Sequence, residues 1–126
     1  MANKTLKVLT REALLQPVKL KKEKVELDQD TCIYVREMTG AERSEFEQLV
    51  QVYDKETNTY MTTTENFLTK VVVCSACDEN GTLLFTKQDV ETLAKNLPIR
   101  LIQKIAEVAS ELNKVDEEEI TKKVKN

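Results

Sequence analysis

The feature that most constrains the fold of this chain is a T-x-x-E pattern at Thr39 and Glu42, directly after a run of strand-forming residues. In such a capping box the side chains of the first and fourth residues each bind the other's backbone N–H, which fixes where a helix begins. Apolar residues then recur at helical spacing, at Phe46, Leu49, Val50 and Tyr53. We therefore expect a helix from Gly40 to about Val52 that buries this face.

Two strand-forming runs precede this helix, at 25–27 and 32–35. The polar residues 28–31 separate them, and two such runs around a polar turn predict a small β-hairpin. The basic residues 18–24 lead into the first run, and we expect them to be extended.

The first 24 residues are strongly basic. Residues 1–24 hold seven Lys or Arg against two Glu, a net charge of +5, which leaves about −8 for the remainder. Within this arm, Thr10 is a suitable N-cap and Pro17 cannot continue a helix, which predicts a short helix over 11–16. The charge could attract nucleic acid, but the clustered Arg/Lys face with aromatic platforms is missing, so nucleic acid is a disfavoured partner.

The middle of the chain is the hardest part to interpret. Residues 54–63 contain four Thr and show no helical period, so we expect a long loop there. Residues 64–77 fit two patterns, because 71–74 resembles a buried strand whereas 67–75 carries a helical stripe. We prefer a helix, since the whole run is longer than a typical strand.

The last part of the chain predicts helices. An Asp-Glu-Asn-Gly turn at 78–81 precedes a capped helix that opens over 85–90 and ends before Pro98. The next helix has the widest apolar stripe in the chain and should be the central core helix. Its stripe comprises Leu101, Ile102, Ile105, Val108, Ala109 and Leu112. A final short helix over 115–126 has only Ile120 and Val124 to anchor it.

Together these elements predict an α+β fold that is predominantly helical, with a small N-terminal β-hairpin followed by about four to five helices. A length of 126 residues suits one compact domain. We divide it into a basic N-terminal arm with a short helix (1–24), a compact α+β core (25–113) and a charged C-terminal helix that is prone to fray (114–126).

The composition argues against an enzyme. Histidine is absent, which removes the commonest general base and the commonest metal ligand. The only glycines, Gly40 and Gly81, cannot form a glycine-rich phosphate loop. Cys74 and Cys77 form a C-x-x-C pattern, but at a helix C-terminus, where the dipole disfavours a thiolate; we interpret them as core residues. We therefore expect no catalytic residues, no cofactor and no metal.

The remaining features point to protein binding. No stretch resembles a signal peptide or a membrane helix, and three cysteines do not make a disulfide framework, so we expect a soluble, cytoplasmic protein. Aromatic and Met side chains on an exposed segment often contact partners. The candidate contact residues are Tyr53, Tyr60 and Met61 at the Thr-rich segment and Ile120 and Val124 in the last helix. The alternative is a merely solvated loop and a merely frayed tail.

The order of several short motifs resembles the tail assembly chaperones of long-tailed, siphovirus-like bacteriophages or prophages. A Thr-Arg-Glu helix start (10–12) leads through a hairpin to Val-Arg-Glu (35–37), and Thr-Gly-Ala-Glu-Arg (39–43) opens a helix. Later motifs are a Cys-rich helix, an acidic Asn-Gly turn, a Phe-Thr-x-x-Asp-Val helix start and Ala-x-Glu-Leu-Asn at 109–113. The resemblance covers most of residues 6–120, and its specificity lies in the order of the motifs.

This resemblance implies a helper protein of the bacterial host cytoplasm that is missing from the mature virion. Its implied partners are the tape-measure protein, which it would keep soluble, and the tail-tube protein, which it would help to recruit. Self-association around the tape-measure protein is a further expectation. Arg36, Glu37 and Arg43 lie in the shared motifs and serve either structural ion pairs or a partner surface.

Two other classes of function stay open from the sequence. One is a structural part of the virion, such as a head-tail connector component. The other is a thiol oxidoreductase that uses Cys74 and Cys77, which would require a thiol with a low pKa.

Overall fold

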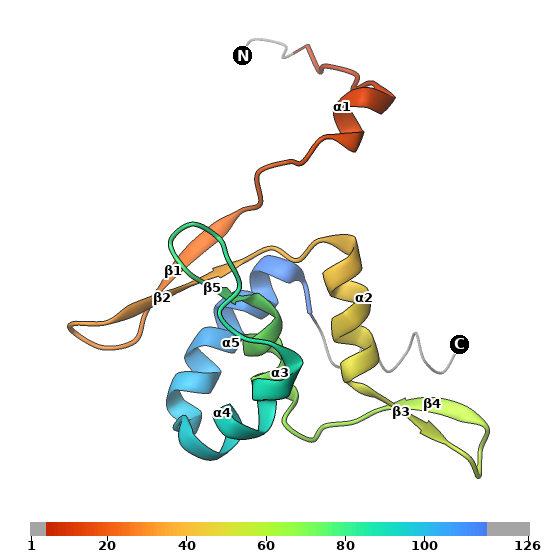
Figure 1. Ribbon diagram of the computed structural model, residues 1–126, viewed down its shortest axis with the longest axis vertical. Helices are drawn as coiled ribbons and strands as arrows, with labels where there is room; N and C mark the ends of the chain where they lie inside the picture. The colour runs from red at the N-terminus through yellow and green to blue at the C-terminus, as the bar shows by residue number, and fades with distance from the viewer. Residues whose placement is uncertain (1–4, 116–126) are drawn as a thin grey trace.

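A computed structural model describes residues 5–115 of the chain (Figure 1). These residues form five α-helices, one short 3-10 helix and five strands. In chain order they are α1 (Arg11–Leu15), β1 (Lys22–Glu26), β2 (Cys32–Arg36), α2 (Gly40–Leu49), β3 (Gln51–Asp54), β4 (Thr59–Thr62), α3 (Phe67–Ser75), β5 (Ala76–Cys77), η1 (Lys87–Asp89), α4 (Val90–Asn96) and α5 (Ile99–Asn113).

The predicted N-terminal hairpin is confirmed and forms most of the first sheet. Strands β1 and β2 pair antiparallel, and the two-residue strand β5 adds to the other side of β2. The turn between β1 and β2 is held by Asp28, whose Oδ1 accepts the N–H groups of Asp30 and Thr31, each at 2.9 Å. Val35, at the centre of the sheet, is completely buried.

The capping box that opens α2 is also confirmed. Thr39 Oγ1 accepts the N–H of Glu42 at 3.2 Å, and Glu42 Oε1 accepts the N–H of Thr39 at 2.9 Å. The predicted end of this helix at Val52 is wrong, because α2 stops at Leu49 and the chain continues into β3. Tyr53 therefore lies on a strand and is exposed, and the helix buries only Phe46.

The loop expected over 54–63 is wrong as well. Strands β3 and β4 form a second, two-stranded antiparallel sheet, with Tyr53 opposite Tyr60 and Val52 opposite Met61. Asn58 adopts the left-handed conformation (φ 55°) that lets the chain reverse. Apolar residues lie on both faces of this hairpin and are exposed to solvent. The sequence therefore lacks the alternation of apolar and polar residues that identifies most strands.

The helix preferred over 64–77 is confirmed as α3, although it covers only Phe67–Ser75 and the predicted end at Cys77 is wrong, because Ala76 and Cys77 form β5. It lies at the centre of the fold. Most of its residues are buried, since it packs against α5, α2, α4 and β2. The completely or almost completely buried Val71 and Val72 account for the pattern that resembled a buried strand. Ser75, also buried, satisfies its hydroxyl by donating to the carbonyl of Val71 at 2.6 Å.

Helix α5 is the long core helix that the apolar stripe predicts. It follows Pro98 and packs against α3, β2 and β1, so the sheet and the helices share one core (Figure 1). The buried residues on it are Ile102, Ile105, Ala106 and Ala109. The expected turn at 78–81 and the capping box of Thr86 and Asp89 before α4 are both present.

The fold class is therefore α+β, with five strands in two small sheets where a predominantly helical chain was expected. Two segments project from the core in Figure 1: the N-terminal arm with α1, and the β3–β4 hairpin beyond the end of α2. The helix predicted over 115–126, with Ile120 and Val124, lies outside the described residues except for Val115.

Candidate protein-interaction surfaces

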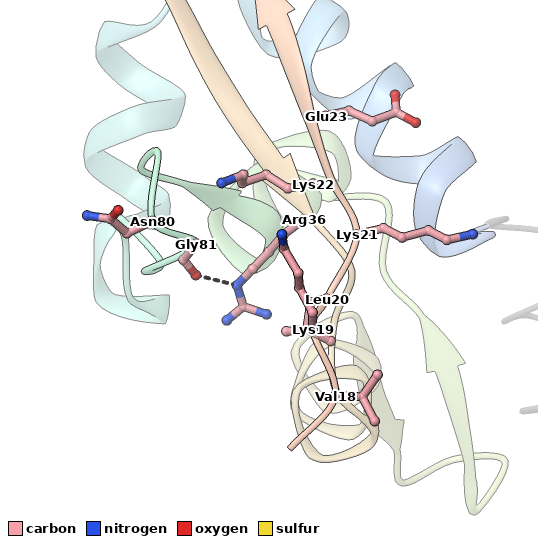
Figure 2. Close-up of a pocket in the computed structure, with 9 residues that line it drawn as sticks. All are labelled: Val18, Lys19, Leu20, Lys21, Lys22, Glu23, Arg36, Asn80 and Gly81. Atoms are coloured by element: carbon pink, nitrogen blue, oxygen red, sulfur yellow. Dashed lines mark hydrogen bonds between the residues drawn. The ribbon is translucent and has the colours of Figure 1, made fainter. Parts of the chain in front are cut away.

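Arg36, at the end of β2, lies at the centre of a hydrogen-bond network. Its Nη1 donates to Glu42 Oε1 and its Nη2 donates to Glu42 Oε2, both at 2.8 Å. The two side chains thus form a bidentate ion pair between β2 and the first turn of α2. Its Nε donates to the carbonyl of Gly81 at 2.8 Å (Figure 2), and Nη1 also reaches the carbonyl of Glu37 at 2.8 Å. The Arg36 side chain is only 9% exposed, so these hydrogen bonds replace the ones that it would otherwise make to water.

The charges of this pair stabilise each other. The hydrogen bond from Arg36 lowers the pKa of Glu42 to about 2, and the backbone N–H of Thr39 contributes to the same effect. The hydrogen bond to Glu42 in turn raises the pKa of Arg36. Glu42 therefore has two structural roles, as an ion-pair partner and as a member of the capping box.

Asn113, the last residue of α5, joins the same region to the C-terminal end of the core. Its Oδ1 accepts the N–H of Met38 at 2.7 Å, and its Nδ2 donates to the carbonyls of Arg36 and Ala109, both at 3.1 Å. Arg43 Nη1 donates to the carbonyl of Asn113 at 2.7 Å. The segment 36–43 is therefore bound to α5, which lies about 75 residues further along the chain.

Glu37 fixes the point where the N-terminal arm leaves the core. Its Oε1 accepts the N–H of Lys21 at 2.7 Å, and its own N–H donates to the carbonyl of Lys21 at 2.9 Å. A hollow of about 700 Å³ lies beside this junction, with arm residues 18–23 along it and Arg36, Asn80 and Gly81 opposite. Figure 2 shows Lys22 directed toward Asn80, whereas Lys21 points away on the other side of the strand.

The structure thus gives Arg36, Glu37 and Arg43 contacts within the chain. Of the two roles open from the sequence, the ion pair accounts for Arg36, and Arg43 is half-buried against Asn113 with its guanidinium 6.0 Å from the Phe46 ring centroid. The motifs at 35–37, 39–43 and 109–113 and the Asn-Gly turn converge on one network. They position structural elements relative to each other, and they leave little of Arg36 for a partner.

The β3–β4 hairpin carries an exposed apolar surface. Tyr53 and Tyr60 form a cross-strand pair with ring centroids 5.2 Å apart, and the Tyr53 hydroxyl bonds to the Asn58 side chain. Val52 and Met61 pair on the opposite face. We call these four residues the hairpin patch; their exposure runs from 45% to 56%. Three of its members, Tyr53, Tyr60 and Met61, were candidates from the sequence, although as parts of a helix end and a loop.

The N-terminal arm carries a second exposed apolar surface, which its basic composition did not predict. Helix α1 has no buried residue. The exposed apolar side chains of the arm are Leu6, Val8, Leu9, Leu14, Leu15 and Val18, with exposures from 53% to 89%. No local signal in the sequence identifies this surface, because apolar residues normally predict burial.

A family model described as "Phage tail assembly chaperone, TAC" matches residues 4–109. The chain belongs to the phage tail assembly chaperone family. The comparisons with curated proteins and with solved structures gave no match.

The match of this tail assembly chaperone to its family includes both projecting segments. It begins in the arm and runs through the hairpin patch, the Arg36 network and most of α5. The description of the family names a role in tail assembly. The exposed apolar surfaces are thus parts of the family's own domain.

The two thiols of the C-x-x-C pattern have the chemistry of core residues in this tail assembly chaperone. Burial raises the pKa of Cys74 to about 11, and the charges of Glu45 and Glu42 add to the shift. Burial also raises the pKa of Cys77. All three cysteines are free. A thiol that attacks a disulfide needs the opposite shift, so the geometry opposes the oxidoreductase alternative.

Other kinds of site find no support within residues 5–115. In this part of the chain, no group of three or more His, Cys, Asp or Glu side chains is arranged to hold a metal ion. Nor does it contain a helix of the length and apolarity needed to cross a membrane. The candidate contact residues Ile120 and Val124 lie beyond the described residues.

Proposed function

We propose that this chain binds the tape-measure protein of its phage during tail assembly, keeps it soluble, and helps to recruit tail-tube subunits. On this proposal it acts in the cytoplasm of the bacterial host and is absent from the mature virion. Membership of the tail assembly chaperone family supports the general role.

The observation that carries the proposal is the hairpin patch. Single exposed apolar residues are normal on protein surfaces, but this projecting hairpin exposes four large ones, two on each face. Tyr and Met are enriched where proteins bind each other, because they bury a large area with adaptable contacts. The hairpin leaves the core at the end of α2, so a partner can reach both of its faces (Figure 1).

The mechanism that we propose uses many weak contacts. In this proposal the tape-measure protein is a long partner whose helical segments would expose apolar strips until tail-tube subunits surround them. Side chains of the hairpin patch would cover such strips one segment at a time, as in helix recognition by apolar surfaces. Several copies on one tape-measure protein would add their affinities, so each contact can stay weak enough to be displaced by tube subunits.

Co-expression with the tape-measure protein of the same phage tests this proposal. We expect the tape-measure protein to move from the insoluble to the soluble fraction and to co-purify with a tagged copy of this chain. A chain in which the hairpin patch is replaced by Thr at all four positions should lose this effect. Unchanged solubility together with no co-purification of the wild-type chain would rule the proposal out.

The composition of purified virions separates this proposal from a structural virion component. A chaperone should be missing from mature particles, as measured by mass spectrometry of purified virions. A fixed number of copies per particle would instead favour a head-tail connector component.

A further inference from the structure

Strand β1 forms a free edge of the three-stranded sheet. The strand order β1-β2-β5 places β2 in the middle, so β1 has a partner on one side only. Just beyond the two ends of β1, the carbonyl of Lys21 accepts the N–H of Glu37 at 2.9 Å, and the N–H of Leu27 donates to the carbonyl of Thr31 at 3.0 Å. These bonds show that the odd-numbered residues of the strand direct their backbone groups toward β2.

The backbone groups on the outer side of β1 are unpaired. Residues that exchange hydrogen bonds across an antiparallel pair alternate with residues that do not. Lys22, Lys24 and Glu26 therefore direct their N–H and C=O groups away from β2. Within residues 5–115, no hydrogen bond uses any of these groups, and all three residues are exposed. Such an edge can bind an extended segment of another protein as a further strand.

This edge is basic on the outer face of the sheet. Residues 18–26 contain four Lys and two Glu, a net charge of +2. The Nζ atoms of Lys22 and Lys24 lie 5.2 and 6.0 Å from the ring centroid of Tyr34, which is directly opposite Lys24. The ring attracts both ammonium groups and so favours their position over this face. Of the two acidic residues, Glu23 lies on the inner face and Glu26 ends the strand.

The inner face of the same edge is apolar at its centre. Val25 is buried in the core, where α5 packs against the sheet. Lys104 of α5 donates to the carbonyl of Leu27 at 3.3 Å, which places another positive charge near the end of β1. The side chains of an added strand alternate between the two faces. One set would lie beside the lysines, and the other set would extend the apolar layer of Val25.

We infer that the β1 edge binds an extended segment of another protein as an additional strand, and that this segment alternates acidic and apolar residues. Its acidic side chains lie beside Lys22 and Lys24. Opposite charges on neighbouring strands stabilise their pairing, whereas the same lysines repel the β1 edge of a second copy. The β3–β4 hairpin projects from the opposite end of the core (Figure 1), so the hairpin patch stays free when the edge is occupied.

Synthetic peptides test the chemistry of the occupant. The probe is a peptide of alternating Glu and Val, and its first control alternates Lys and Val, which keeps the strand propensity and reverses the charge. A second control alternates Glu and Gly, which keeps the charge and removes the apolar side chains. We expect the probe to bind at least about tenfold more tightly than either control in fluorescence anisotropy, and more weakly as salt rises.

N-methylated versions of the probe test the backbone pairing. The N–H groups of its Glu residues lie along one side of the extended peptide and those of its Val residues along the other. Methylation on the side that faces β1 should lower the affinity about tenfold, and methylation on the other side should leave it unchanged. Amide hydrogen exchange of the protein locates the contact, because the bound probe should protect the N–H groups of Lys22, Lys24 and Glu26.

Protein variants test the edge from the other side. Lys24→Pro removes an N–H that points outward, which a strand edge tolerates, and Lys24→Thr is its control with the same loss of charge. The Pro variant should bind the probe about tenfold more weakly than the Thr variant. Circular dichroism and thermal unfolding check that each variant folds.

A charge-reversed pair tests the lysines. Lys22→Glu with Lys24→Glu should abolish binding of the probe. Its control, Lys55→Glu with Lys95→Glu, makes the same change of charge at two exposed positions outside this sheet and should bind as the wild type does.

Four results would overturn the inference. They are no binding of the probe at about millimolar concentration, equal effects of N-methylation on both sides, protection that maps away from residues 18–26, and unchanged binding by the charge-reversed pair. Protection of the same N–H groups in the protein alone, rising with its concentration, would show a second copy on the edge and would also contradict it. The test needs no tape-measure protein, so its failure and a failure of the proposed function are told apart.

Discussion

The guanidinium of Arg36 and the carboxylate of Glu42 face each other through two hydrogen bonds of 2.8 Å, which join the end of β2 to the first turn of α2. They lie only six positions apart in the sequence, yet Arg36 also reaches the carbonyl of Gly81, 45 positions further along the chain. One side chain thus fixes the strand, the helix and the Asn-Gly turn relative to each other.

Replacing Arg36 with Met should destabilise the fold by about 3 kcal/mol, because it leaves a half-buried Glu42 carboxylate without its counter-ion and two carbonyls without donors. Urea denaturation measures the change in free energy of unfolding. The exposed Glu91→Ala is the control, and we expect it to stay within about 0.5 kcal/mol of the wild type. A loss below about 1 kcal/mol for Arg36→Met would contradict a central structural role for this pair.

The stability of the fold should fall with acid in a defined window. The pKa of Glu42 is lowered from 4.5 to about 2 in the folded chain, so the folded state binds its proton more weakly than the unfolded state. The stabilisation is complete above pH 4.5 and is lost as the pH falls toward 2. The free energy of unfolding of Glu42→Gln should therefore depend less on pH in this window. Parallel curves for the two proteins would show that the pair does not titrate as described.

Thr39→Ala should cost about 1 kcal/mol, because it removes the side-chain acceptor of the capping box. Thr39→Ser keeps a hydroxyl and should recover most of this loss, and Ser44→Ala, at an exposed position of the same helix, is the control. Chemical denaturation of the four proteins provides the comparison. Equal stability of the Ala and Ser variants would argue against capping as the role of Thr39.

The thiols should differ sharply in reactivity. Cys74 and Cys77 have raised pKa values, whereas Cys32 is exposed, so at pH 7.5 a disulfide reagent should modify one thiol quickly and two slowly. Cys32→Ser should abolish the fast phase. Fast reaction of Cys74 in the folded chain would contradict its raised pKa and would support the oxidoreductase alternative.

The elements that the sequence predicted correctly depend on local signals. The start of α2 follows from Thr39 and Glu42, three residues apart, and α5 follows from its apolar stripe. A local signal also led to the wrong end for α2. Tyr53 continues the helical spacing of Phe46 and Val50, although it lies in β3. In the β3–β4 hairpin, the one local sign of a chain reversal was an asparagine, Asn58, which adopts the left-handed conformation in the structure.

The contacts of the network could not be predicted, because they join residues distant in sequence. Nothing at Asn113 indicates that its side chain binds Met38 and Arg36. The exposed leucines of the arm were equally hidden, since apolar residues normally predict burial. Only the arrangement of the elements reveals that nothing packs on them within the described chain.

Co-purification of the tape-measure protein with paired hairpin variants tests the central claim most directly. One variant replaces Val52, Tyr53, Tyr60 and Met61 with Thr, which retains strand propensity, and its control replaces Lys55 and Glu56 in the turn of the same hairpin with Ala. We expect the patch variant to recover about tenfold less soluble tape-measure protein than the wild type, and the control to match the wild type. Equal recovery by both variants, with both folded, would contradict the role of the hairpin patch.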